Sequence, residues 1–133
     1  MFEKLEEALN LCDAKNFDLS KGFTKEQYEN LNDYISYCEN KLNYVLEELK
    51  KFEDNNSLSL KDFEDKIQEK ILYLMDDISS EMYLIQNFLP EIKNLDKEYY
   101  ENLNMNIDGV EALLLMIPEE VEKTKCVKLA FLN

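Results

Sequence analysis

Apolar side chains recur at helical intervals over most of this chain. In the longest stripe, successive apolar residues are three or four positions apart. Its members are Phe63, Ile67, Ile71, Leu74, Ile78, Met82, Ile85 and Leu89. Only a helix brings positions with this spacing onto one face. Ser59 is a suitable N-cap, and Pro90 ends the pattern because proline cannot donate the next backbone hydrogen bond. The pattern predicts a central helix over about 60–89.

A stricter stripe precedes the central one. Its apolar residues alternate between intervals of three and four, which is the 3.5-residue period of coiled-coil packing. They are Tyr28, Leu31, Ile35, Cys38, Leu42, Val45, Leu49 and Phe52. Thr24 and Gln27 have the spacing of a capping box in front of it. We therefore predict a helix over about 25–53, and the short polar segment after it predicts an antiparallel hairpin with the central helix.

The two ends of the chain give less regular patterns. Residues 2–14 fit a short amphipathic first helix. Beyond the central helix, a shorter helix is predicted to break at the polar segment Asn104–Asp108. Pro118 then predicts a kink or a restart in the helix that follows. Residues 124–133 fit either a closing helical turn or a short edge strand, and the pattern leaves both open.

Together these elements predict an all-α protein with a single domain over residues 1–133. Its scaffold is expected to be the long antiparallel hairpin of 25–53 and 60–89. A short N-terminal helix and a broken C-terminal helical segment are expected to fill the groove of that hairpin. Composition agrees, because two glycines and two prolines are too few for the many turns of a sheet protein.

Charge limits the kinds of partner that the chain can bind. It has 29 acidic residues against 15 basic ones, all of them Lys, and a net charge of −14. Such a chain repels nucleic-acid phosphates and anionic membranes, and it lacks the bidentate Arg donor that reads guanine. We expect a basic protein partner, with no direct nucleic-acid binding and no membrane binding. The Arg-free, Asn-rich usage would also follow from an AT-rich genome, and the composition leaves both origins open.

The chemical inventory argues against catalysis. Without His, the chain has no imidazole general base and no Ser-His or Cys-His pair. The two glycines, Gly22 and Gly109, stand alone, so no phosphate-binding loop is present. Asp76 and Asp77 are adjacent and point about 100° apart on a helix, so they do not converge on one ion or proton. We expect no enzyme activity, no cofactor and no metal site.

Cysteine usage bears on the cellular compartment. Cys12, Cys38 and Cys126 are odd in number and widely spaced, which is typical of free thiols in a reducing, cytoplasmic setting. Cys38 lies on an apolar stripe and is expected to be buried, whereas Cys126 lies among lysines and is expected to be exposed. The acidic N-terminus is unlike a signal peptide, and the longest apolar run, Ala112–Ile117, is too short to span a bilayer.

The candidate site lies on the polar faces opposite the two long stripes. Tyrosines are mixed there with carboxylates, which combine a broad rigid contact area with electrostatic steering of a cationic partner. The candidate partner-binding residues are Asp33, Tyr37, Tyr44, Glu48, Tyr73, Asp76, Asp77 and Tyr83. The alternative is that some of these tyrosines pack beneath the C-terminal segment as part of the core.

In size, acidity and predicted helicity, and in no specific motif, the chain resembles small acidic helical immunity proteins and nuclease inhibitors. Its charge, its missing catalytic residue types and its tyrosines favour a non-enzymatic inhibitor that masks a basic surface, such as the nucleic-acid channel of a nuclease or the active face of a toxin. One alternative is a helical secretion or assembly chaperone or adaptor that cradles a partner helix. Exposed Leu84, Leu114 or Phe131 would favour this alternative. Another is a self-associating structural subunit.

Overall fold

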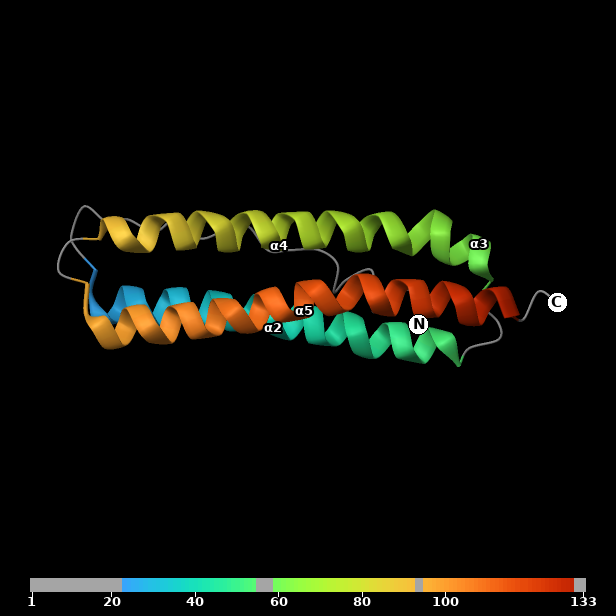
Figure 1. The fold of residues 1–133 in the computed structure, drawn as a ribbon, viewed down its shortest axis with the longest axis horizontal. Coiled ribbons are helices and arrows are strands. Elements are labelled where there is room, and N and C mark those ends of the chain that lie inside the picture. Colours follow the sequence, from blue (N-terminus) through green and yellow to red (C-terminus); the bar gives the residue numbers. More distant parts are fainter. Residues whose placement is uncertain (1–22, 55–58, 93–94, 131–133) are drawn as a thin grey trace.

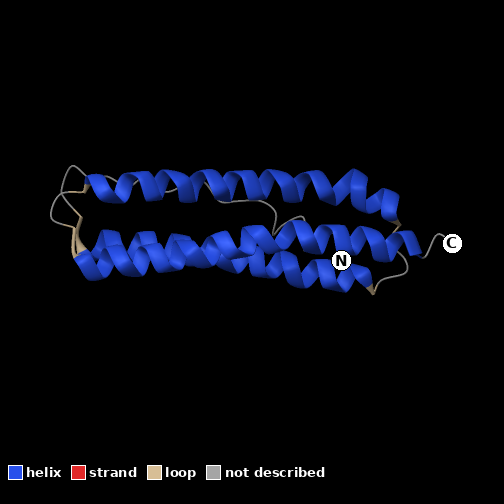
Figure 2. Ribbon diagram, in the orientation of Figure 1, coloured by secondary structure: helices blue, strands red, loops and turns tan. Residues whose placement is uncertain are grey.

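The computed structural model describes residues 23–54, 59–92 and 95–130, and these residues form helices joined by short connections (Figures 1 and 2). The all-α prediction is confirmed for this part of the chain, in which no strand occurs. The predicted first helix over 2–14 lies outside the described residues. The elements are, in chain order, α2 (Lys25–Glu53), α3 (Leu60–Phe63), the π-helical η1 (Glu64–Gln68), α4 (Glu69–Phe88), the 3₁₀ turn η2 (Leu89–Glu91) and α5 (Lys97–Ala130).

Helix α2 has the predicted bounds and the predicted cap. The hydroxyl of Thr24 accepts a hydrogen bond from the backbone N–H of Gln27 at 3.2 Å, and the Gln27 side chain accepts one from the backbone N–H of Thr24 at 3.0 Å. This reciprocal capping box satisfies two backbone donors that the first helical turn leaves free. The predicted stripe is buried from Leu31 to Phe52, and Tyr28 is half-buried against the core.

The central rod consists of α3, η1 and α4. Ser59 caps it as predicted, because its hydroxyl accepts a hydrogen bond from the backbone N–H of Asp62 at 3.1 Å. The π-helical turn η1 was not predicted. Two successive four-residue steps separate Phe63, Ile67 and Ile71, and in a regular α-helix each step would rotate the side chain by about 40°. The wider π turn compensates for this rotation, and all three residues are buried.

The C-terminal segment differs from its prediction. Helix α5 is one continuous helix that passes through Asn104–Asp108, where a break was predicted, and it contains Pro118 without a restart. The described part of the tail is helical up to Ala130, so an edge strand is wrong for these residues. A buried stripe runs across the polar segment and explains this continuity. Its members are Leu103, Ile107, Val110, Ile117, Val121, Thr124 and Lys128. Packing of this stripe outweighs the weak local propensity and the hydrogen bond that proline cannot donate.

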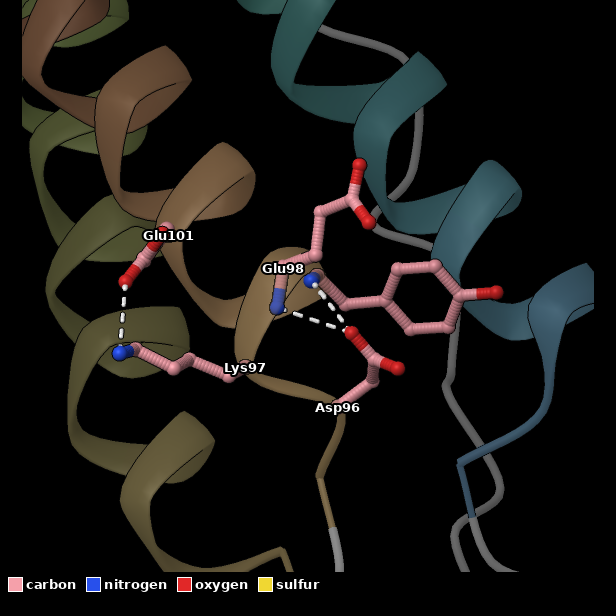
Figure 3. A network of polar contacts seen from close by, with 5 residues as sticks. Asp96, Lys97, Glu98 and Glu101 are labelled. Atoms are coloured by element: carbon pink, nitrogen blue, oxygen red, sulfur yellow. Dashed lines mark hydrogen bonds and ion pairs between the residues drawn. The ribbon is translucent and has the colours of Figure 1, made fainter.

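A side-chain cap fixes the start of α5 (Figure 3). One carboxylate oxygen of Asp96 accepts hydrogen bonds from the backbone N–H groups of Glu98, at 2.8 Å, and Tyr99, at 3.3 Å. Lys97, the next residue, forms an exposed ion pair at 3.8 Å with Glu101, which lies one turn later. The aspartate satisfies free backbone donors of the first turn, and therefore the helix begins at Lys97.

Helices α2 and α5 lie side by side and run in the same direction. The rings of Tyr28 and Tyr99 stack at 4.1 Å near one end of the pair. Near the other end, the hydroxyl of Thr124 donates to the carboxylate of Glu53 at 3.4 Å. The hydrogen-bonded pair Tyr28 and Asn102 is 74 positions apart in sequence, and the pair Glu53 and Thr124 is 71 positions apart. Because this separation is nearly the same at both ends, the two helices must be parallel.

Helix α4 lies beside this parallel pair and runs in the opposite direction (Figure 1). The predicted fold, led by a hairpin of 25–53 and 60–89, is not confirmed, because the main packing partner of α2 is α5. The core lies between the three long helices. Each helix contributes the apolar residues of one stripe, including Leu42 from α2, Ile78 from α4 and Ile107 from α5.

Candidate partner-binding surface

The outward side of α4 gathers the candidate residues of the central rod. Because Ile71, Leu74 and Ile78 face the core, the positions opposite them project away from the bundle. Tyr73 and Tyr83 are 61% and 64% exposed, so they are not packed beneath the C-terminal segment. We define the α4 face as the six exposed residues Leu72, Tyr73, Asp76, Asp77, Tyr83 and Leu84.

Tyr73 is held in place by its own helix. Its hydroxyl donates a hydrogen bond to the carboxylate of Glu69, one turn earlier, at 2.9 Å. This hydrogen bond and the negative charge of Glu69 raise the pKa of the Tyr73 phenol, which therefore stays protonated at neutral pH. The ring is thus presented in a defined orientation, and a partner loses less side-chain freedom when it binds there.

The α4 face is negatively charged. Asp76 and Asp77 are both exposed between the two tyrosines. From residue 71 to residue 92 the sequence contains no Lys, so no basic side chain within that stretch offsets the two aspartates. The acid pair lies on a helix, whose rise of about 1.5 Å per residue places Tyr73 and Tyr83 about 15 Å apart along the axis.

The candidate residues of α2 are placed differently. Asp33 is exposed, and Tyr37 and Tyr44 are half-buried. The ring of Tyr37 lies 6.4 Å from that of Tyr34 and beneath the ammonium of Lys41, at 5.3 Å. Glu48 is only 3% exposed. The α2 candidates therefore do not form a uniformly exposed surface like the α4 face.

Glu48 contributes a buried carboxylate with a local partner. The ammonium of Lys51 donates to Glu48 at 3.0 Å, and this hydrogen bond is the main cause of the raised pKa of Lys51. A carboxylate so covered cannot touch a partner protein without a change in the surrounding packing. Glu48 therefore belongs to the interior of the bundle.

A second polar cluster lies between α2 and α5. The carboxylate of Glu53 accepts from the Thr124 hydroxyl and lies 4.0 Å from the Lys123 ammonium. Burial, and then the neighbouring carboxyl group of Glu120, raise the pKa of Glu53. One oxygen of Glu120 is buried and has no hydrogen-bond partner among the described residues. The sequence patterns did not predict this cluster, because they do not show which polar residues two helices bring together.

The two described cysteines are free thiols with the predicted exposures. Cys38 is buried, and desolvation raises its pKa to about 11, so very little reactive thiolate is present at neutral pH. Tyr34 lies one turn before Cys38 on α2. Burial, together with the nearby Cys38 and with Glu81 of α4, raises the pKa of Tyr34. Cys126 is exposed on α5.

Neither a metal site nor a membrane-spanning helix occurs in the part of the chain that the structure describes. No group of three or more Cys, Asp or Glu side chains is arranged there to hold an ion. None of the described helices has a segment long and apolar enough to cross a bilayer. In comparisons with known proteins, no family model, no curated protein and no solved structure matches this chain.

Proposed function

We propose that this protein is a non-enzymatic inhibitor that uses its α4 face to cover a basic surface of a partner protein. The observation that carries this proposal is the pair of exposed tyrosines, Tyr73 and Tyr83, on either side of the exposed acids Asp76 and Asp77. Rigid aromatic rings supply contact energy, whereas the aspartates steer a cationic partner and set its register. A nuclease or a toxin with a positively charged active face has the surface chemistry required.

The rest of the molecule supports this role in two ways. A net charge of −14 accelerates association with a basic protein and repels competing nucleic acid. We further propose that residues 25–53 and 60–89 form an antiparallel helical hairpin, with the α4 face on its outer side. The free thiols Cys38 and Cys126 are consistent with our proposal of a reducing, cytoplasmic setting.

The test begins with capture of a partner from the native host by the full chain, followed by affinity measurements on the purified pair. We expect the dissociation constant to rise at least tenfold between low and high salt, because ions screen a charge-steered complex. Asp76→Asn with Asp77→Asn should weaken binding and flatten the salt dependence. A matched control, Glu26→Gln with Glu47→Gln, removes two exposed charges from α2 and should leave the salt dependence nearly unchanged. An affinity independent of salt would overturn the proposal.

A second candidate function is that of an adaptor or assembly chaperone that holds an apolar partner helix. It is supported by Leu72 and Leu84, which are exposed on the same face. In this case binding should tolerate salt and the two Asp→Asn changes, but should be lost in Leu84→Gln. An inhibitor should instead lose affinity with added salt and with the two Asp→Asn changes, and it should be less affected by Leu84→Gln. The same set of variants therefore separates the two functions.

A further inference from the structure

Helix α5 carries a second exposed apolar surface, separate from the α4 face. Met105, Leu115 and Met116 are 65%, 76% and 51% exposed, and Ala112 between them is exposed as well. At about 100° per residue, Met105, Ala112 and Met116 lie about 180–220° from the buried Leu103, and Leu115 lies about 120° from it. The four residues Met105, Ala112, Leu115 and Met116 therefore lie on the side of the helix opposite the core. We refer to them as the α5 methionine stripe.

Acidic residues surround this stripe. Between Lys97 and Lys123 the helix contains no basic residue. The acids in that interval are Glu98, Glu101, Asp108, Glu111, Glu119, Glu120 and Glu122. Asp108 and Glu119 are exposed and lie about 140° and 160° from Leu103, on the same side as the apolar residues. The outward side of α5 thus combines apolar contact area with the negative charge of Asp108 and Glu119.

The residue types suit a docking surface. The side of α5 that faces the core is filled by buried residues from Leu103 to Val121. The exposed residues of the α5 methionine stripe are therefore not needed for the core. Exposed apolar patches with a polar rim mark sites of interaction. Methionine has a flexible thioether that adapts to the shape of a partner, and it recurs on surfaces that bind helices.

The charge selects one class of occupant. A second copy of the chain would place acid against acid, because both stripes would lie within the same acid-rich interval, which has no Lys between Lys97 and Lys123. Nucleic acid and anionic membranes are repelled for the same reason. A helix with apolar residues on one side and Lys or Arg along its edges matches both the apolar stripe and its acidic surroundings.

We infer that the α5 methionine stripe is a docking surface for a cationic amphipathic helix of another protein. The stripe extends from Met105 to Met116, or about 17 Å, which corresponds to three turns of a partner helix. The partner's apolar residues pack on the methionines and Leu115, whereas its basic residues reach Asp108 and Glu119. This inference rests on α5 alone and does not depend on the function proposed for the α4 face.

The test uses the full chain and a synthetic helical peptide of Leu and Lys, about 18 residues long, with Leu at helical spacing. A second peptide has the same composition in an order without helical amphipathicity. Binding is followed by calorimetry. We expect the amphipathic peptide to bind the wild type and the reordered one to bind at least tenfold more weakly. Leu115→Gln with Met116→Gln should weaken binding at least tenfold, and Asp108→Asn with Glu119→Gln should weaken it and reduce its salt dependence.

Matched controls distinguish the stripe from the general acidity of the chain. Tyr100→Gln with Leu129→Gln changes two other exposed residues of α5 and should leave peptide affinity within twofold of the wild type. Circular dichroism should show unchanged helicity for every variant. The inference is overturned if both peptides bind equally well, or if the Leu115→Gln, Met116→Gln variant binds like the wild type.

Two further measurements address the other classes of occupant. Sedimentation should show that wild type and the Leu115→Gln, Met116→Gln variant have the same oligomeric state. A wild-type dimer that this variant dissociates would overturn the inference in favour of a second copy. Flotation with phosphatidylcholine vesicles should recover no protein, and wild-type binding lost in the variant would overturn it in favour of a lipid surface.

Discussion

Helices α2 and α4 have similar sequence patterns but are covered to different extents in the bundle. Both carry an apolar stripe that is buried and an opposite side that mixes tyrosine with carboxylate. In α4 that opposite side is exposed, whereas in α2 Tyr37 and Tyr44 are half-buried and Glu48 is buried. The stripe of a helix shows which side faces the core. The stripe does not show how much of the remaining helix surface is covered by neighbouring helices.

The extent of coverage follows from packing partners. Helix α2 has α5 along its length, in a parallel arrangement with a constant offset. It buries Tyr34, Leu46 and Glu48 in addition to its predicted stripe. Helix α4 buries only stripe residues. The tyrosines and carboxylates opposite the stripe are therefore more exposed on α4 than on α2.

The largest expected effect tests this difference in coverage. Leu46 lies outside the α2 stripe but is buried, so Leu46→Ala should lower the free energy of unfolding by about 2–3 kcal/mol. Leu84→Ala on the α4 face should change it by less than about 0.5 kcal/mol, because the side chain is already in solvent. Urea unfolding measures both. Equal losses would show that the two helices are covered alike.

The second prediction concerns binding. Tyr83→Ala should cost about 2 kcal/mol of partner binding, as expected for a central aromatic contact, and little stability. Tyr37→Ala should do the opposite, because its ring packs against the core of the bundle. Titration of the purified partner and urea unfolding of the free protein give the two quantities. A Tyr37→Ala variant with the larger binding defect would transfer the site to α2.

Much of the fold could be predicted from periodicity. The stripe from Phe63 to Leu89 is buried throughout, as is the α2 stripe from Leu31 to Phe52, and the two predicted side-chain caps are present. Repeated spacing is a reliable signal because each stripe residue must reach the same core. The π turn at Glu64–Gln68 could not be predicted in this way, since it changes the backbone and leaves the stripe intact.

The C-terminal helix shows where local patterns fail. Asn104–Asp108 has the composition of a break, yet Ile107 within it lies on the buried stripe. Thr124 and Lys128 continue that stripe as polar residues, which a search for apolar letters passes over. The break was predicted from local propensity, and tertiary packing decides against it.

The candidate site could be predicted in part, because helical periodicity shows which residues share a side of a helix. A count of about 100° per residue was enough to assign Tyr73, Asp76, Asp77 and Tyr83 to the outer side of α4. The same count could not show that Glu48 is buried, since the covering segments are set by tertiary structure. The α5 methionine stripe was missed because the helix was expected to break at Asn104–Asp108, a segment that contains Met105.

A third prediction compares buried and exposed acids. In the folded protein Glu53 has a raised pKa, so it contributes stability at pH values below the ordinary glutamate pKa and loses that contribution as the pH rises through the raised value. Glu53→Gln should therefore stabilise the protein at neutral pH and have a smaller effect at about pH 4. Urea unfolding at the two pH values tests this. Asp77→Asn, which removes an exposed negative charge from the α4 face, is the control.

The smallest effect tests the packing of α5 against α2. Gly109 lies inside α5, and a Cβ atom added there would meet the carboxylate of Glu39 on α2 at 3.7 Å, which is ordinary van der Waals contact. Alanine restricts the unfolded chain and favours a helix, so Gly109→Ala should stabilise the protein by roughly 0.5–1 kcal/mol in thermal or urea unfolding. Gly109→Val is the control for size, because a branched side chain crowds the same contact and has a lower helix propensity, which reduces the gain. A loss of stability in Gly109→Ala would mean that α2 and α5 approach each other more closely at Gly109 than this contact distance allows.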